Sequence, residues 1–298
     1  MIMNKMIKMM VLAMAGMLSV TTVYAEDVEK TIDASSNGNV SISNIAGSIE
    51  VTGWSKNQVE VIADLGRGVE ELIVERDGND IIIKVKVSRR NARSISSDLT
   101  IHVPENSSLE VAGVSADIEV SNVFGELRLH TVSGDMASDV YGSDVQIDTV
   151  SGDIELQGDN QDMRTEAATV SGDVEATSLA GSIEAESVSG DVEIVNGSFE
   201  RAQANTVSGD IVFHAELRNG GKLQIETING EVDINFTGTV SARFDIETFN
   251  GDIRNCFGPE PVRASRYTPG QELNFTEGDG DSRVVIETLN GDITLCRD

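Results

Sequence analysis

The sequence Thr-Val-Ser-Gly-Asp occurs at residues 131–135, 149–153, 169–173 and 206–210, and residues 187–191 differ from it only in a leading Ser. The same unit returns with Asn in place of Ser at 227–231, 248–252 and 288–292, and a degenerate copy stands at 113–117. Successive copies begin 18, 18, 20, 18, 19, 21, 21 and 40 residues apart. A period of this length indicates a protein built from stacked structural units.

Short alternating runs separate the copies. Val145, Ile147 and Thr149 alternate with polar residues before one turn, and Ile154 and Leu156 follow it. Period-two alternation of β-branched residues predicts strands with one buried face. Most units also carry a second turn, at Gly125, Gly142, Gly158, Gly181, Gly197, Gly220 or Gly238. Each unit therefore reads as strand, corner, strand, corner, which is one rung of an all-β parallel β-solenoid.

The repeat predicts columns of equivalent residues along a rod. With rungs about 4.8 Å apart, nine copies make a rod on the order of 40 Å long. The Thr residues that open the units are expected to stack, as are Asn229, Asn250 and Asn290, whose amides can hydrogen-bond along the axis. We expect solenoid repeats at residues 111–256, an inserted loop at 257–282 and the last rung at 283–298.

The N-terminal part lacks the repeat period. Residues 1–25 have the features of a secretory signal peptide: Lys5 and Lys8, a short apolar run, and a small-x-small site that ends at Ala25. Residues 26–110 alternate as strands, with a hairpin signal at 77–80. An exposed first rung would template further strands, so we interpret this region as an N-terminal β cap.

The composition limits the partners. The chain has 22 Lys and Arg against 50 Asp and Glu, a net charge of −28. Without the signal peptide and its two Lys, the balance is 20 minus 50, or −30. Nucleic acids and anionic membranes bind through Lys and Arg, so neither is expected as a partner. Cationic peptides or divalent ions would be attracted, although the charge can equally serve only as a solvated surface.

Three features together resemble a known family. They are Gly47-Ser-Ile-Glu-Val-Thr-Gly-Trp54, the strand Leu99-Thr-Ile-His-Val-Pro104, and the serial Thr-Val-Ser-Gly-Asp copies. They are similar to the bacterial β-strand-repeat family called domain of unknown function 4097, over nearly all of residues 40–298. The resemblance implies an adhesin-like envelope protein, and some relatives in Gram-positive bacteria are tied to envelope-stress responses. It implies no catalytic residues.

One acidic residue closes each unit, and these acids are expected to form a ladder. Carboxylates about 4.8 Å apart repel by roughly 1 kcal/mol per neighbour in water. Either each Asp bonds the N–H groups of its own turn and extends into solvent, or divalent cations such as Ca²⁺ bridge neighbouring rungs. The candidate metal ligands are Asp135, Asp153, Asp173, Asp191, Asp210, Asp252 and Asp292. The turn offers Ca²⁺ few oxygens, so no cofactor is expected, with Ca²⁺ as the alternative.

A glycan-cleaving β-helix enzyme is the catalytic alternative. Retaining glycosidases use carboxylates about 5–5.5 Å apart, and every adjacent pair in an acidic ladder has roughly that spacing, so the spacing selects no site. His102, His130 and His214 are scattered, with no spacing typical of a metal site or a catalytic triad. We therefore expect no enzymatic activity.

The only two cysteines are expected to form a disulfide. Cys256 and Cys296 each lie five residues after a repeat glycine. If the 40-residue step hides a whole extra rung, their Cα atoms would be about 9.6 Å apart, too far to bridge. If one rung carries an insertion, they lie about 4.8 Å apart. The prolines of residues 257–282 favour the insertion, and a bond there would clamp the last rung.

These observations predict a non-catalytic exported protein that presents a rigid acidic rod as an adhesin-like or envelope-stress interaction scaffold. The partner is a protein, a cationic peptide or an envelope glycan, and no membrane span is expected after signal removal. The periplasm is the expected compartment, with the cell surface or secretion as alternatives. A passive rod stabilised by cations remains the alternative function. An exposed apolar patch would favour interaction, because such patches mark binding surfaces.

Overall fold

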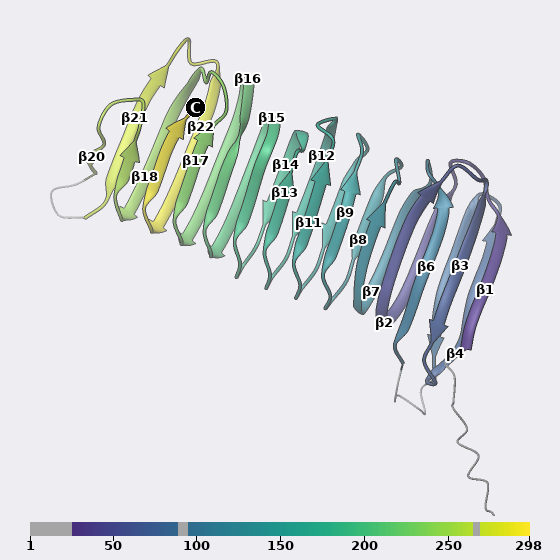
Figure 1. The fold of residues 1–298 in the computed structure, drawn as a ribbon. Helices are drawn as coiled ribbons and strands as arrows, with labels where there is room; N and C mark the ends of the chain where they lie inside the picture. The colour runs from purple at the N-terminus through teal and green to yellow at the C-terminus, as the bar shows by residue number, and fades with distance from the viewer. Residues whose placement is uncertain (1–25, 89–94, 265–268) are drawn as a thin grey trace, which may run out of the picture.

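The protein is an elongated, flattened rod of stacked β-strands (Figure 1). The computed structural model describes residues 26–88, 95–264 and 269–298, so the expected signal peptide lies outside the described residues. Those residues form 23 strands and no helix. The all-β parallel solenoid predicted from the repeat is therefore confirmed.

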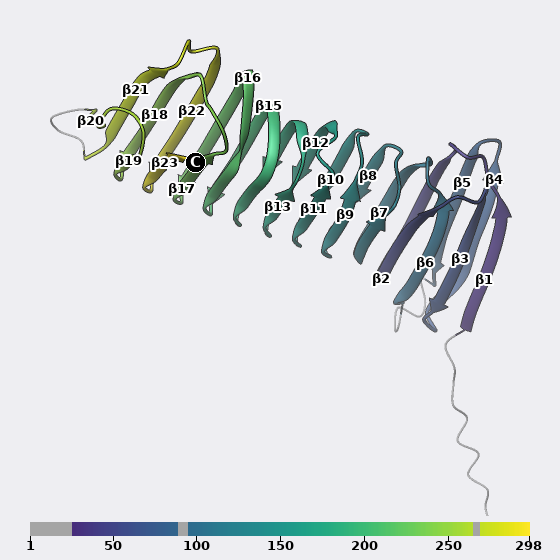
Figure 2. The same ribbon diagram turned by 45° about the horizontal axis from the view of Figure 1, so that its top comes forward.

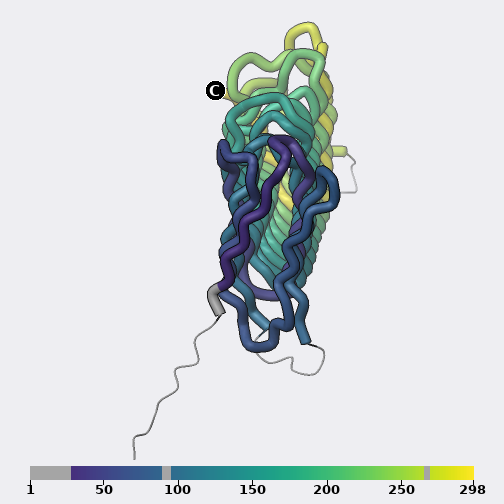
Figure 3. The backbone as a smooth tube through the Cα atoms, turned by 90° about the vertical axis from the view of Figure 1, so that its right-hand side faces the viewer, coloured from purple at the N-terminus to yellow at the C-terminus, as the bar shows by residue number. Residues whose placement is uncertain are grey.

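Each rung contributes one strand to each of two walls, as the end-on view shows (Figure 3). We call the wall before the Thr-x-Ser/Asn-Gly-Asp corner wall A and the wall after it wall B. In the middle of the rod, wall A contains β8 (Leu127–His130), β10 (Val145–Asp148), β12 (Asp162–Ala168) and β14 (Ala180–Glu186). Wall B contains β9 (Met136–Val140), β11 (Ile154–Gly158) and β13 (Val174–Thr177).

The longer strands pass from one wall to the other. They are β2 (Asn39–Trp54), β7 (Ser108–Ser121), β15 (Val192–Ser208) and β16 (Ile211–Asn229). Because β7 runs through residues 108–121, the expected boundary between cap and solenoid at 110/111 falls inside a strand.

The repeat sets the register of the rungs. Val145 pairs with Leu127 on one side and with Thr165 on the other, and Ile154 pairs with Met136 and Val174, all in parallel. At the corner, the Ser residues of six successive units pair in one line from Ser115 to Ser208. The predicted superposition of the turns in one column is therefore confirmed.

The core is a thin layer between the walls. Alternate residues such as Val145, Ile147, Ile154 and Leu156 are buried, as the period-two pattern requires. Toward the C-terminal end a run of rings replaces this aliphatic filling. Phe199, Phe213, Phe236 and Phe244 follow one another with centroids 6.0 Å apart. Aromatic residues are scarce in the sequence, and their clustering at this end could not be predicted from it.

The rungs do not follow chain order at the C-terminal end. Here wall A contains β18 (Ala242–Asn250) and β22 (Ser282–Asn290), and wall B contains β17 (Val232–Phe236), β19 (Ile253–Asn255) and β23 (Ile293–Arg297). β22 pairs in parallel with β16 on one side and β18 on the other, and β23 lies between β17 and β19 (Figure 2). The prediction that residues 283–298 are the last rung is therefore wrong. The chain ends in the penultimate rung.

The insertion is more than a loop. Its strand β21 (Gln271–Glu277) pairs antiparallel along its whole length with residues 242–248 of β18, and β20 (Val262–Arg263) pairs with β21. Phe275 of β21 stacks on Phe244 with ring centroids 4.4 Å apart. The strands β20 and β21 therefore cover the outermost strand of wall A, with β21 running antiparallel to it.

The N-terminal region combines a cap with a complete rung. β2 pairs in parallel with β7 along both walls, so residues 39–54 form a rung that lacks the repeat motif. The other strands are β1 (Glu26–Asp33), β3 (Gln58–Leu65), β4 (Val69–Asp77), β5 (Asp80–Val87) and β6 (Ser97–Pro104). The antiparallel pairs β1–β3, β3–β6 and β4–β5 close this end of the rod.

Candidate functional site

The corner of each rung is held by contacts to the neighbouring rung. The Thr206 hydroxyl donates to the Gly190 carbonyl oxygen at 3.0 Å, and Thr248 makes the same bond to Gly291. A Cβ on Gly209 would lie 2.0 Å from the Gly190 carbonyl oxygen. This close approach, rather than a left-handed backbone alone, explains why Gly recurs at this place in the unit.

The acids that close the units form the expected ladder, joined by Asp117 at one end and by Glu231 between Asp210 and Asp292. Its order along the rod is Asp117, Asp135, Asp153, Asp173, Asp191, Asp210, Glu231, Asp292 and Asp252. One of the two alternatives from the sequence, that each Asp bonds the N–H groups of its own turn, is not what the structure shows. Instead, Oδ1 of Asp153 accepts the backbone N–H of Asp173 on the next rung at 2.9 Å, and Oδ1 of Asp191 accepts that of Asp210 at 2.7 Å.

These bonds offset the repulsion along the ladder. A hydrogen bond to a charged group contributes about 1.5–3 kcal/mol, against roughly 1 kcal/mol of repulsion per neighbour in water. Within the described part of the chain, no three His, Cys, Asp or Glu side chains are placed to hold a metal ion together. Bridging by Ca²⁺ thus stays a hypothesis for experiment.

A second acidic column lies on wall B beside the ladder. Glu155 pairs with Glu175, and Glu175 with Glu193, along β11, β13 and β15. Partial burial raises the pKa of Glu175, and the charges of Glu193 and Glu155 raise it further. The outer face of wall B is therefore strongly negative, with its carboxylates crowded enough to favour protonation of the central one.

Wall A ends at the corner in a line of exposed apolar side chains. They are the second residues of the units, and each is 40–51% exposed. In spatial order they are Val114, Val132, Val150, Val170, Val188, Val207, Ile228, Leu289 and Phe249. We call this line the corner ridge. Eight steps of about 4.8 Å make it roughly 38 Å long.

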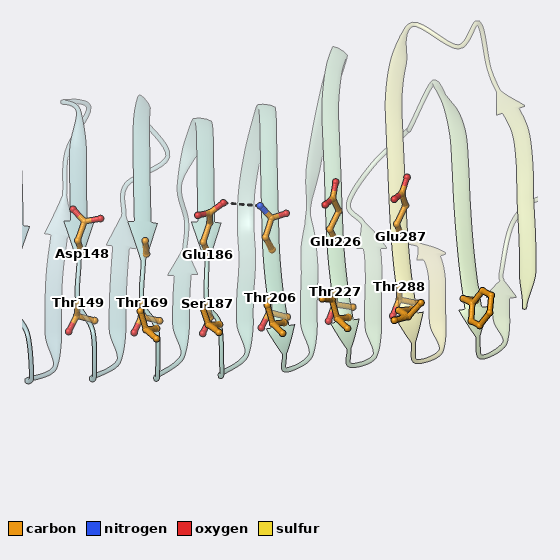
Figure 4. A pocket seen from close by; sticks show the side chains of 18 of the residues that line it. Asp148, Thr149, Thr169, Glu186, Ser187, Thr206, Glu226, Thr227, Glu287 and Thr288 are labelled. Atoms are coloured by element: carbon orange, nitrogen blue, oxygen red, sulfur yellow. Dashed lines mark hydrogen bonds between the residues drawn. The ribbon is translucent and has the colours of Figure 1, made fainter.

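A shallow groove of about 850 Å³ runs beside the corner ridge on the outer face of wall A. Its apolar side is the ridge from Val170 to Phe249, and its polar side is the column two residues earlier on each strand. Figure 4 shows the carboxylates of Asp148, Glu186, Glu226 and Glu287 in a row above the corner Thr and Ser residues. Glu247 also lines the groove, and we call these five residues the groove acids.

The groove has no counter-charge of its own. The described residues that line it include no Lys, Arg or His. Three groove acids have neutral partners. Glu186 Oε1 accepts the Asn205 side-chain amide at 2.9 Å, Glu226 Oε1 accepts that of Gln224 at 2.7 Å, and Asp148 Oδ2 accepts that of Gln146 at 3.3 Å. The groove therefore presents apolar surface and unneutralised carboxylates side by side.

The sequence contained the signal for this surface. An apolar residue stands second in every unit, and a buried Thr or Ser precedes it in all but the degenerate first copy. Strand alternation places the second residue outside, so the ridge follows from the same period-two rule that predicts the core. The strand pattern predicted from the sequence did not include these residues.

The remaining candidate residues do not gather at a site. Cys256 and Cys296 form a disulfide with Cα atoms 4.9 Å apart, on the adjacent rungs that the insertion reading required. His102 stacks on Trp54, with ring centroids 5.0 Å apart, and His214 lies 3.6 Å from Asp233. None of these groups lines the groove.

Across residues 26–88, 95–264 and 269–298, no helix is long and apolar enough to cross a membrane. The family model described as Toastrack DUF4097 matches residues 16–186 and 177–296. No curated protein matches the sequence.

Solved structures resemble the chain at low sequence identity. A candidate adhesin from Bacteroides fragilis NCTC 9343 is 11% identical, with 90% of this chain and 96% of that chain covered and a TM-score of 0.49. A candidate lipid-binding protein from Parabacteroides distasonis ATCC 8503 is 15% identical, with the same coverage and a TM-score of 0.46.

Proposed function

The chain belongs to the Toastrack DUF4097 family, and we propose that it is a non-catalytic, exported envelope protein that uses its rigid rod as an adhesin-like interaction scaffold. The rod would hold one long binding surface in a fixed shape, because every rung is hydrogen-bonded to its neighbours in register. The binding surface in this proposal is the corner ridge with its groove.

The observation that carries the proposal is the exposure of the corner ridge. Soluble monomers rarely expose contiguous apolar patches of more than a few hundred Å², and larger ones mark interaction sites. A ridge residue such as Val188, 44% exposed, adds nothing to the core and lies in line with its neighbours. A solenoid needs only a polar residue there to stay soluble, so a purely structural rod gives no reason for the pattern.

Two features support export. Residues 1–25 have the composition of a signal peptide, and the disulfide between Cys256 and Cys296 is typical of an oxidising compartment. We propose the periplasm as the compartment. Fractionation of cells that express the full chain tests this: recovery of the uncleaved protein in the cytoplasm, with both thiols free, would contradict it.

The geometry gives no reason to assign catalysis. The groove acids repeat at the rung spacing, so no one pair is distinguished as a catalytic pair. A site for glycan cleavage would break the pattern with Arg, Lys or aromatic residues, and among the described lining residues only Phe249 does so.

The test of the proposal is binding that depends on the ridge. Residues 26–298 are immobilised on a solid support and incubated with envelope extract. The variant Val170→Thr/Val188→Thr/Val207→Thr, which keeps the β-branched shape but adds hydroxyls, is tested in parallel. The wild type should retain envelope components that the variant loses, with circular dichroism showing the same fold. If both proteins retain the same components, the ridge is not the binding surface.

A further inference from the structure

We propose that the groove beside the corner ridge binds a cationic amphipathic helix of a partner protein, laid lengthwise along the rod. The inference rests on the proposed function and names the chemistry of the partner at that same surface. The apolar side of the helix would cover the ridge, and its Lys and Arg side chains would face the groove acids.

The distribution of charge around the groove indicates that the partner is positively charged. Asp148, Glu186, Glu226, Glu287 and Glu247 stand along one side of the groove without a basic residue among its described lining. On the other side of the corner, three residues after each ridge residue, stands one acid of the ladder. An apolar partner with acidic flanks would meet like charge on both sides of the ridge, whereas a basic one would be attracted along its whole length.

The spacing of the ridge favours a helix. Ridge side chains repeat at about 4.8 Å along the rod. A helix presents one apolar side chain per turn of about 5.4 Å, whereas an extended strand presents one every 6.6 Å or so on the same face. The helix therefore matches the ridge more closely. A helix of about 18 residues is roughly 27 Å long, close to the six steps of about 4.8 Å between the rungs of Asp148 and Phe249.

A second copy of this chain fits the surface poorly. Two ridges brought together would also bring together two rows of groove acids, each on a protein with a net charge of −28. Like charges directly opposed across an interface oppose association. The acidic walls likewise disfavour an anionic lipid surface.

The experiment uses residues 26–298 and designed helical peptides of about 18 residues. One peptide has a Leu face flanked by Lys, a second has the same Leu face flanked by Glu, and a third has Ser in place of Leu with Lys retained. Affinities are measured by isothermal calorimetry or fluorescence anisotropy. We expect the Leu/Lys peptide to bind at least about tenfold more tightly than either of the others.

Three protein variants locate the binding. Glu186→Gln/Glu226→Gln/Glu287→Gln removes three groove acids, and Glu155→Gln/Glu175→Gln/Glu193→Gln removes three charges from wall B as a matched control. The groove variant should bind the Leu/Lys peptide about tenfold more weakly, and the wall B variant should change its affinity by less than about twofold. The variant Val170→Thr/Val188→Thr/Val207→Thr should also lose about tenfold.

Four outcomes overturn the inference. They are equal binding of the Leu/Lys and Leu/Glu peptides, equal binding of the Leu/Lys and Ser/Lys peptides, equal loss in the groove and wall B variants, and ridge-dependent self-association in sedimentation. If envelope components still bind through the ridge in any of these cases, the proposed function stands and only the partner class is wrong. If they do not, the proposed function fails as well.

Discussion

The hydroxyl of Thr206 offers a test of how one rung is attached to the next. This side chain is 5% exposed, and its Oγ1 donates to the Gly190 carbonyl oxygen at 3.0 Å. Thr206→Val keeps the shape of the side chain and removes only the donor. A typical internal hydrogen bond contributes about 0.5–1.5 kcal/mol, and a buried group left without its partner costs about 1–3 kcal/mol. We therefore expect Thr206→Val to lower the free energy of unfolding by about 1–2 kcal/mol.

Thr149 in the same column is the matched control. It is also 5% exposed, but its hydroxyl has no hydrogen-bond partner. Thr149→Val removes a buried hydroxyl that is not satisfied, so its effect should lie between no change and a gain of about 1 kcal/mol. The two substitutions are chemically identical and differ only in the bond that is lost.

Urea unfolding followed by circular dichroism measures the difference, and amide hydrogen exchange shows whether it is local. Repeat proteins are stabilised mainly through neighbouring units, so exchange should rise first at the Gly190 and Gly209 corners in Thr206→Val. Equal losses in both variants would show that shape or methyl packing, rather than the hydrogen bond, sets the stability of the corner. No loss in Thr206→Val would refute the reasoning directly.

Three further outcomes are expected. Replacing Cys256 and Cys296 by Ser should destabilise the C-terminal rungs by about 4 kcal/mol in the loop-entropy description for a sequence separation of 40, read as faster amide exchange in β19 and β23; unchanged exchange there would show that the bond is not a clamp. Glu175→Gln should raise the melting temperature near neutral pH, because the raised pKa of Glu175 means that its ionised form opposes folding and that stability falls as pH rises through the window above 4.5. This gain should vanish as pH falls to 4.5 and should be absent in the control Glu70→Gln on β4, and a pH-independent gain would contradict the electrostatic cause. Millimolar Ca²⁺ should raise the melting temperature no more than a salt of matched ionic strength, since a saturated site would add about 2.7 kcal/mol at 100 times its Kd; a rise specific to Ca²⁺ would show that cations bridge the acid ladder.

The repeat predicted most of the architecture because its rules are local. Alternation along Val145, Ile147 and Thr149 determines which face is buried, and the recurring glycine determines where neighbouring rungs come closest. The columns of Thr, Asn and Asp follow from the constant step. The Asn column is observed, with Asn290 donating its side-chain amide to the Oδ1 of Asn229 at 2.9 Å.

Features that depend on the order in which the rungs stack, or on contacts between rungs, could not be predicted in the same way. The acid ladder bonds the next rung rather than its own turn, and a sequence shows neighbours along the chain more directly than neighbours across a stack. The strand β21 was predicted as a loop because its apolar residues, Leu273 and Phe275, are too few to display alternation. The ridge was missed because an apolar residue in a strand is expected inside, unless its buried neighbour is considered with it.

The order of the rungs at the C-terminal end shows what the repeat leaves open. The acid-ladder bond recurs from corner to corner, so it does not determine which rung stacks on which: the Asp252 N–H donates to Asp292 at 2.8 Å as the Asp210 N–H does to Asp191 at 2.7 Å. The order must then come from residues that do not repeat. Two such features involve the last two rungs, namely the disulfide from Cys256 to Cys296 and the stacking of Phe244 on Phe275. The disulfide requires the two rungs to be adjacent but does not determine which of them is outermost. The antiparallel strand β21 determines this order, because it pairs with one side of β18 and leaves only the other side for β22.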